Sequence, residues 1–491
     1  MSNFVVEFKL KTEIYQEDIL EKRFEIARKI YNALVTKIAK RYHEFIKTKR
    51  YRKVQIVLTQ CKNIKNEELK KQSLKELNLL YKEYGFSEYK FHADVKEFQH
   101  HFKKNLDSFT AQKLATNLWK SYEKFIFGNG NKIHYKKFDS MFSIEGKSNK
   151  TGIRFLDNNL IWLGLKVPVV INKNNQYEVE SLKNPISYCR IIRKFVRNKY
   201  KYYLQIIFKG VPPAKINLKT GEIKNPIGEG RVGLDIGTQT LAISSEKEVK
   251  ILEIADRVNN IEHMKKNILR KLDRSRRASN KDNFNLNGTI KKQGNKRVLW
   301  IKSNRYVALQ KKLKELYRKQ ADVRKYQHEK LANEIISLGD DFFVEKMSFS
   351  GLQRRAKRTE VNEQGKFKRK KRFGKSLGNK APSMFLNILE RKLLSWNLSL
   401  KKIDTWSVKA SQYNHIDDSY KKKKLSARWN IIEGERVQRD MYSAFLIMNV
   451  NEDLKSIDKK RCEETYKNFL KLHNEEIKRL IGNKNLSSIG I

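Results

Sequence analysis

The chain has 491 residues, and its 106 Lys and Arg against 54 Asp and Glu give a formal charge of +52. A hydrophobic fraction of 39% with 11% aromatic residues excludes a disordered basic tail and allows roughly two to four domains. The positive charge predicts a polyanionic partner, and its spread along the chain favours nucleic acid over a membrane patch.

Two further classes are excluded by what the sequence lacks. No apolar run approaches the roughly 20 residues of a transmembrane helix, and the opening Met1–Phe4 has no signal-peptide pattern. Cys61, Cys189 and Cys462 lie far apart and fit no paired motif, so we expect no disulfide framework. We therefore expect a cytoplasmic protein without a membrane partner.

The N-terminal part alternates between strand and helix patterns. Apolar residues alternate from Phe4 to Leu10, which predicts a strand. Helical spacing follows from Leu20 to about Phe127, and from there to Phe208 the pattern changes to short β-like runs. A hairpin turn is predicted at Arg197–Lys201. This order predicts a β-domain interrupted by a helical domain.

The C-terminal part begins after a segment rich in Pro and Gly, the composition of a linker. Two long charged helices are predicted at about Val258–Arg277 and Val298–Ile336, joined by the Asn- and Lys-rich stretch Ser279–Gly294. We expect these helices to form a paired arm outside the core.

The predicted domains follow from these changes of pattern. They are a β-rich domain at 1–15 and 128–211, a helical domain at 16–127, a linker at 212–230, and a last domain at 231–491.

Three short segments each deliver one carboxylate. Asp235 follows the apolar run that begins at Val232, Glu345 ends the run Phe342–Val344, and Asp440 starts an apolar helix. Clustered carboxylates on rigid elements supply the hard oxygen ligands that Mg²⁺ prefers. Two strand acids and one helix acid that converge resemble the two-metal phosphodiesterase site of a ribonuclease-H-like fold.

Each acid also has another interpretation. Gly233–Gly237 could be a phosphate loop of the actin and sugar-kinase type, although no second Gly-rich phosphate segment follows. Glu345 could merely end a core strand, and Asp440 could be the N-cap of its helix. The order of strand Asp, long helical insert, strand Glu and helix Asp favours the nuclease interpretation.

The same segments carry a family resemblance. Gly233–Gly237 resembles the first RuvC motif, Val344–Leu352 the second and Arg439–Ala444 the third. Two further segments, Ser411–Gln412 and His134–Ile144, share this resemblance. Together with the three motifs, they make most of the chain similar to the TnpB proteins of insertion elements. The miniature type V CRISPR nucleases are relatives of that family.

The resemblance implies a multidomain α/β plus β-barrel architecture. It implies a RuvC-like (ribonuclease-H-like) nuclease domain with helical inserts, and an N-terminal oligonucleotide-binding-like β-domain interrupted by a helical recognition domain. It also implies that Asp235, Glu345 and Asp440 bind two Mg²⁺ ions, with Mn²⁺ as a possible substitute. One ion would activate water and the other would stabilise the leaving 3′ oxygen.

The implied activity is that of an RNA-guided DNA endonuclease. Its partners would be a guide RNA and double-stranded target DNA next to a short recognised motif. Two alternatives remain open: an unguided RuvC-type resolvase or transposition-associated nuclease, and a binding-only RNA-guided repressor. The three intact acids argue against the repressor.

The third motif departs from the family pattern. Gln438 stands where an Asp is usual, and Tyr442 and Ser443 occupy the usual Asn and first Ala positions. Asp440 remains, so we expect the substitutions to affect the rate of cleavage rather than metal binding.

The resemblance also implies a degenerate zinc ribbon at 411–436, because both Cys-X-X-Cys knuckles of the family have lost their thiolates in this chain. Asn414, Asp417, Asn430 and Glu433 stand at the aligned positions. Amide and carboxylate side chains are poor ligands for structural Zn²⁺, so we expect no structural zinc. The lone His415 is predicted to be a surface residue.

Two basic segments are candidates for contacts with nucleic acid. Residues Gln353–Lys380 hold 12 Lys or Arg against two Glu, and a merely solvated charge run is the alternative. Contacts with phosphates give affinity but little sequence specificity. The predicted binding residues are Lys368, Arg369, Lys370, Lys371 and Arg372 of this segment, and Arg270, Lys271, Arg274, Arg276 and Arg277 of the first long helix.

Overall fold

The computed structural model describes residues 3–64, 66–128, 130, 132–291, 298–353, 363–364, 373–422 and 427–481. The chain divides into two units, Met1–Ala214 and Lys215–Ile491. Both units combine helices with a β-sheet, so the chain is a mixed α/β protein, as predicted.

The first unit is built on one antiparallel sheet with the strand order β2-β6-β7-β1-β5-β4-β3. Its elements, in chain order, are β1 (Asn3–Leu10), α1 (Ile14–Phe45), α2 (Lys49–Ile64), α3 (Glu67–Glu83), α4 (Glu88–His101), α5 (Ser108–Ile126), β2 (Ser143–Glu145), β3 (Arg154–Leu156), β4 (Asn159–Trp162), β5 (Leu165–Val170), α6 (Gln176–Leu182), β6 (Ile186–Val196) and β7 (Lys199–Lys209). The pairings of the described residues run from β2 to β3 without closing the β-barrel that we predicted.

Strand β1 lies between β7 and β5, and helices α1 to α5 separate it in sequence from the other strands. Its side chains alternate between exposed and buried, which confirms the predicted strand. The predicted hairpin is confirmed as well: β6 and β7 pair up to Val196 and Lys199. Arg197 and Asn198 between them have φ of 49° and 66°, as a two-residue type I′ turn requires.

The second unit contains a five-stranded sheet with the order β10-β9-β8-β11-β12. Its elements are β8 (Arg231–Ile236), β9 (Thr240–Ser245), β10 (Val249–Glu253), α7 (Val258–Ala278), a short 3₁₀ helix (Lys281–Asn283), α8 (Asn304–Ile336), β11 (Asp341–Glu345), α9 (Phe349–Gln353), α10 (Gly374–Lys380), α11 (Pro382–Leu394), β12 (Leu400–Ile403), α12 (Thr405–Val408), β13 (Tyr413–Asn414), β14 (Ser419–Tyr420), β15 (Trp429–Ile432), β16 (Glu435–Gln438), α13 (Arg439–Met448) and α14 (Lys459–Ile481). Strands β8 to β10 pair antiparallel, whereas β8, β11 and β12 run parallel.

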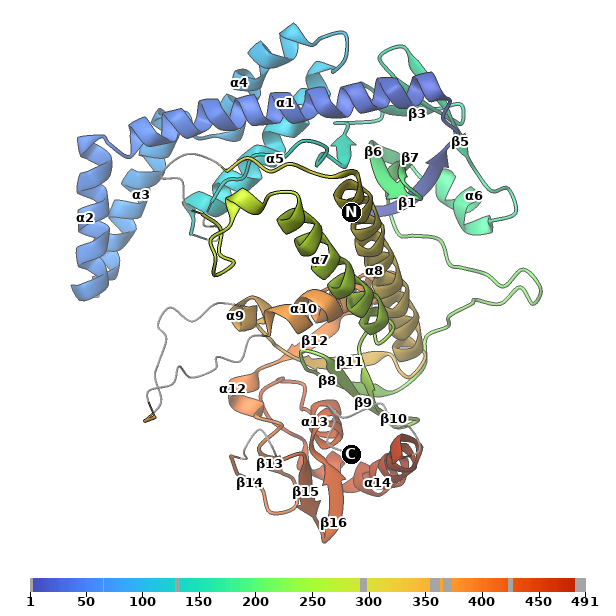
Figure 1. Ribbon diagram of the computed structural model, residues 1–491. Coiled ribbons are helices and arrows are strands. Elements are labelled where there is room, and N and C mark those ends of the chain that lie inside the picture. The colour runs from blue at the N-terminus through green and yellow to red at the C-terminus, as the bar shows by residue number, and fades with distance from the viewer. Residues whose placement is uncertain are drawn as a thin grey trace. The chain divides into compact units, whose positions relative to one another are not determined.

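Helices cover both faces of this sheet. Leu234 and Val344 pack on one face with residues of α8 and α11. Phe343 packs on the other face with residues of α13 and α14. Helix α13 lies directly against β8, β9 and β11 (Figure 1). Alternate residues of each strand therefore enter different cores, as the two-residue period of a strand requires.

One glycine permits the close approach of α13. A Cβ atom on Gly233 would lie 2.1 Å from the carbonyl oxygen of Ala444 and 2.4 Å from the backbone nitrogen of Met448. Both obstructing atoms belong to the helix backbone, which cannot move aside as a side chain can. Any residue other than glycine would push α13 away from β8.

The predicted paired helices are confirmed as α7 and α8, which pack through Ile268, Leu272 and Leu316 (Figure 1). The expectation that they lie outside the core is wrong at their ends near the sheet, because Val258 of α7 and Leu331 of α8 pack in the core of the sheet. Helix α8 begins at Asn304, later than predicted, because Ser303 accepts a hydrogen bond from the backbone nitrogen of Tyr306 at 3.2 Å and so acts as the N-cap. None of the helices in the described residues, the long α8 included, is long and apolar enough to cross a membrane.

We predict that Gly233→Ala destabilises the second unit by about 3 kcal/mol, because overpacking against rigid backbone atoms cannot relax. Hydrogen exchange of the α13 amides and urea unfolding would measure the effect. Gly378→Ala in α10 is the matched control, because its Cβ would meet no atom within 4 Å. Equal stability of the Gly233→Ala variant and the wild type would contradict the close contact.

Candidate active site

Strands β8 and β11 bring Asp235 and Glu345 to the same edge of the sheet. The two strands are parallel, with Gly233 opposite Phe343 and Leu234 opposite Val344. Continuing this register sets Asp235 beside Glu345. Because side chains alternate along a strand, both acids project to the face of Gly233 and Phe343, where α13 packs.

Helix α13 supplies the third acid to that face. Ala444 lies over Gly233, and Asp440 precedes it by one helical turn, about 5.4 Å along the axis. Asp235 follows Gly233 by two strand residues, about 6.6 Å. The helix runs against the strand direction, so Asp440 and Asp235 advance toward the same end. Close packing at Gly233 thereby determines where Asp440 stands.

The three acids interact electrostatically. Burial raises the pKa of Asp235 well above its ordinary value, and the negative charges of Glu345 and Asp440 raise it further, while Arg439 opposes them. Burial also raises the pKa of Glu345. Like charges held close together in a partly buried site favour the binding of a cation.

Two arginines that the sequence interpretation missed bind Asp440. Arg439 Nη2 lies 3.0 Å from Asp440 Oδ1, and Arg428 Nη1 lies 3.4 Å from Asp440 Oδ2. Arg439 Nη1 also donates to the carbonyl oxygen of Ala427 at 3.0 Å. The pairing of β15 with β16 brings Arg428 to this place, and no local sequence pattern predicts that contact.

Gln438, the departure from the family motif, caps the helix. Its Oε1 accepts a hydrogen bond from the backbone nitrogen of Met441 at 2.8 Å, and α13 begins at the next residue. The alternative in which Asp440 is the N-cap is therefore wrong. Asp440 lies inside the first turn, where the helix dipole stabilises a negative charge.

His415 and Tyr442 form a buried pair, so the prediction of His415 as a surface residue is wrong. His415 is 0% exposed, because it is surrounded by the rings of Tyr442, Phe445 and Tyr466. Its Nδ1 lies 2.6 Å from Tyr442 Oη. Burial lowers the pKa of His415 to about 4, so the ring is neutral at pH 7. The Tyr442 substitution is thus accommodated in the core.

The four positions that replace the zinc knuckles lie in the hairpins β13–β14 and β15–β16 and in the turns next to them. Asn414 Oδ1 accepts from the backbone nitrogen of Ile416, and Asp417 Oδ1 accepts from that of Ser419. Glu433 has a φ of 50° in the turn between β15 and β16. Asn430 is buried in β15.

The three acids have the ligand chemistry that Mg²⁺ prefers, but they do not form a complete coordination site. Asp235, Glu345 and Asp440 offer hard carboxylate oxygens, and the pKa of Asp235 is raised first by burial and then by the charges of the other two acids. Within the described part of the chain, no three His, Cys, Asp or Glu side chains stand close enough to hold a metal ion as they are. Arg428 and Arg439 neutralise part of the negative charge of Asp440, as a bound cation would.

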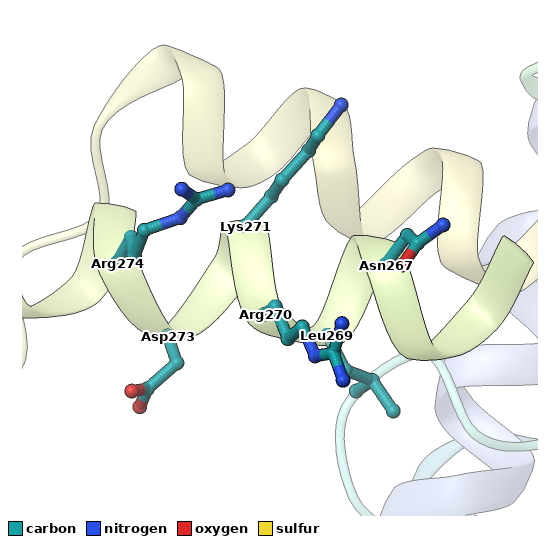
Figure 2. Close-up of a pocket in the computed structure, with 6 residues that line it drawn as sticks. All are labelled: Asn267, Leu269, Arg270, Lys271, Asp273 and Arg274. Carbon is teal, nitrogen blue, oxygen red and sulfur yellow. The ribbon is translucent and has the colours of Figure 1, made fainter. Parts of the chain in front are cut away.

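The basic residues of α7 separate into two groups. Arg270, Lys271 and Arg274 line a cavity of about 750 Å³, and Figure 2 shows Lys271 and Arg274 extending to one side of the helix and Arg270 to the other. Arg276 and Arg277 both pair with Asp273 at 2.8 Å.

The guanidinium groups of these two arginines also stack on aromatic rings. Arg276 lies over Trp300 and Arg277 over Phe284. Arg276 and Arg277 thus have partners within the protein, whereas Arg270, Lys271 and Arg274 line the cavity.

The second basic segment is only partly described. Lys368, Arg369, Lys370, Lys371 and Arg372 lie outside the described residues. At the end of the segment, Lys380 is buried and its Nζ lies 2.7 Å from Glu253 Oε1. Lys375 pairs with Glu262 at 3.7 Å. The charge of Lys380 therefore anchors the segment to β10 and does not face a ligand.

No protein-family model and no curated protein matches the chain. Among solved structures, the chain is similar to one titled "Cryo-EM structure of the Cas12f1-sgRNA-target DNA complex", with 9% sequence identity and a TM-score of 0.40. The match covers 90% of this chain and 98% of that one. A likeness of this size carries no argument about function, so the site is interpreted from its own residues.

We predict that Asp235→Asn makes the metal-free protein more stable at neutral pH. Because its folded-state pKa is raised, Asp235 favours folding below its ordinary pKa of about 4, and that stability is lost as pH rises through the raised value. Melting temperature against pH, with EDTA or with Mg²⁺, would test this. The Asp235→Asn variant should show a smaller decline of melting temperature with rising pH and a smaller increase of melting temperature on addition of Mg²⁺.

The exposed Asp322 of α8 provides the control for that measurement. Asp322→Asn should leave the response to Mg²⁺ unchanged. An Asp235→Asn variant with the same pH and Mg²⁺ response as the wild type would show that Asp235 is not part of a cation site.

We also predict that the purified protein carries no stoichiometric zinc, because amide and carboxylate side chains stand at the knuckle positions. Elemental analysis would measure the metal content. A result of about one Zn²⁺ per chain, lost when Asn414, Asp417, Asn430 and Glu433 are changed to Ala, would contradict the expectation for a structural site.

Proposed function

We propose that the second unit is a RuvC-like nuclease domain that hydrolyses phosphodiester bonds in DNA. The observation that carries the proposal is the placement of Asp235, Glu345 and Asp440 on one face of the sheet, where their charges interact. The mixed sheet supports it, because two parallel neighbouring strands and the helix packed on them contribute one acid each. Such a constellation is the way a ribonuclease-H-like fold builds a two-metal site.

In this proposal Asp235, Glu345 and Asp440 hold Mg²⁺, which supplies activation of water and stabilisation of the leaving 3′ oxygen. The protein's own groups have separate tasks. Asp235 and Glu345 present partly buried carboxylates from rigid strands. Arg428 and Arg439 orient the Asp440 carboxylate at the start of α13, and Gln438 holds the helix start in place.

We further propose that the cleavage is RNA-guided. The support is the order and content of the three acid motifs, which resemble those of TnpB proteins and the miniature type V nucleases. The formal charge of +52 suits a protein that holds both a guide RNA and a DNA target. Pairing between guide and target would give the sequence specificity, and the protein would read a short flanking DNA motif.

In this proposal the first unit, an oligonucleotide-binding-like sheet with its helical insert, holds the guide. The hairpins within 411–436 are then the metal-free remainder of a zinc ribbon. RNA that copurifies with the protein would support a guided enzyme, and its absence would favour an unguided nuclease.

We predict that Asp235→Ala, Glu345→Ala and Asp440→Ala each abolish cleavage and leave DNA binding within about tenfold of wild type, because the acids act on metal rather than on the duplex. Cleavage of a supercoiled plasmid and a gel-shift titration would measure the two properties.

Glu435→Gln, in an exposed position of β16, is the matched control and should cleave at the wild-type rate. Wild-type cleavage by any of the three alanine variants would remove that acid from the site.

A further inference from the structure

A second cavity lies beside the acid site, at the end of two parallel strands. Glu345 of β11 pairs in register with Ile403 of β12, so the residues that follow them emerge at the same sheet edge. The cavity has a volume of about 590 Å³. It is lined by Lys346, Met347, Ser348, Phe349 and Ser350 after β11, by Asp404, Thr405 and Trp406 after β12, and by Ser383 of α11.

Trp406 is the most unusual part of this cavity, because it is 85% exposed. Large aromatic side chains gain free energy by leaving water, so an exposed indole at a cavity offers a flat surface on which a ligand can pack. No aromatic or cationic side chain of the described residues stacks on its ring, in contrast to Trp162, Trp300 and Trp429.

The backbone that carries the indole is firmly held. Asp404 Oδ1 accepts from the backbone nitrogen of Trp406 at 3.1 Å, and Asp404 Oδ2 accepts from Ser407 Oγ at 3.0 Å. The backbone nitrogen of Asp404 donates to the carbonyl oxygen of Leu454 at 3.0 Å. The bonds that the Asp404 carboxylate accepts from Trp406 and Ser407 lower its pKa. They also engage its carboxylate within α12, so the ring is presented from a rigid base.

The polar groups of the cavity complement this flat surface. Lys346 is exposed and immediately follows Glu345, and Ser348, Ser350 and Ser383 are exposed hydroxyls. Lysine and hydroxyl side chains are common donors to phosphate oxygens, and an exposed aromatic ring is a stacking surface for an unpaired base. An apolar peptide would leave these donors without acceptors.

We propose that this cavity binds an unpaired nucleotide next to the phosphodiester bond at the acids, with its base stacked on Trp406 and its phosphate at Lys346. The proposal rests on the proposed nuclease function, to which it adds a subsite that positions the strand beside the bond to be cut. Because stacking tolerates any base, the pocket positions the strand without reading its sequence.

The test measures binding in EDTA, so that cleavage does not contribute. The probes are a single-stranded DNA and a single-stranded RNA of roughly 12 nucleotides, and the DNA duplex of the same sequence. Indole fluorescence reports stacking, because a stacked base quenches it. We expect quenching by a single strand in the wild type, and loss of that quenching in Trp406→Phe with the affinity largely kept.

Trp406→Ala should weaken single-strand binding by between about 5-fold and 150-fold, the range for loss of one base–aromatic contact. Lys346→Gln should reduce the salt slope by about 0.7, as loss of one phosphate contact on a single strand predicts. Tyr326→Ala, an exposed aromatic residue of α8, is the control and should change neither property. Unaltered melting of Trp406→Ala would confirm that its fold is intact.

The possible results separate this proposal from the nuclease proposal. Quenching by DNA alone, RNA alone or both supports the pocket and identifies the strand. Equal quenching by the duplex, or unchanged affinity and salt slope in Trp406→Ala and Lys346→Gln, overturns it. If quenching depends on Trp406 but the protein does not cleave DNA in the presence of Mg²⁺, the nucleotide-binding proposal is supported and only the nuclease proposal is overturned.

Discussion

The contact between the backbones of α13 and β8 is the constraint on which the candidate site depends. At Gly233 the helix comes so near the strand that a methyl group would lie 2.1 Å from the carbonyl oxygen of Ala444. Close packing of this kind holds a helix in register with a sheet, because sliding by one residue would bring side chains into the contact. Asp440 of the helix and Asp235 of the strand both lie toward the same end of this contact.

The electrostatics of the site follow from that placement. Bringing Asp235, Glu345 and Asp440 to one partly buried edge raises the pKa of Asp235, which costs stability in the absence of a cation. The β15–β16 hairpin offsets part of this cost, because it places Arg428 and Arg439 on Asp440. The region of the β15–β16 hairpin thus contributes to the site.

The large positive charge of the chain is used in more than one way. Lys380 is buried against Glu253, so its charge serves the fold, and Arg276 and Arg277 pair with Asp273 within α7. Other basic residues line cavities, such as Arg270 on α7 and Lys346 beside the acids. Net charge alone predicts a polyanionic partner, whereas only the contacts separate structural cations from those open to a ligand.

Local patterns were sufficient for the features that depend on neighbouring residues. The alternation from Phe4 to Leu10 predicted β1, and the turn at Arg197–Lys201 predicted the β6–β7 hairpin, because side-chain period and turn conformation are local properties. The three acids could be chosen because each one ends an apolar strand or begins an apolar helix.

Contacts between distant segments were decided by the tertiary structure. A histidine in a polar stretch looks exposed, yet His415 is buried because helices α13 and α14 bring aromatic rings around it. Arg428 reaches Asp440 through strand pairing, and Trp406 meets the residues after Glu345 because β11 and β12 are parallel neighbours. The sequence by itself determined the elements and the acids, but burial and pairing depend on which surfaces meet, and that is a property of packing.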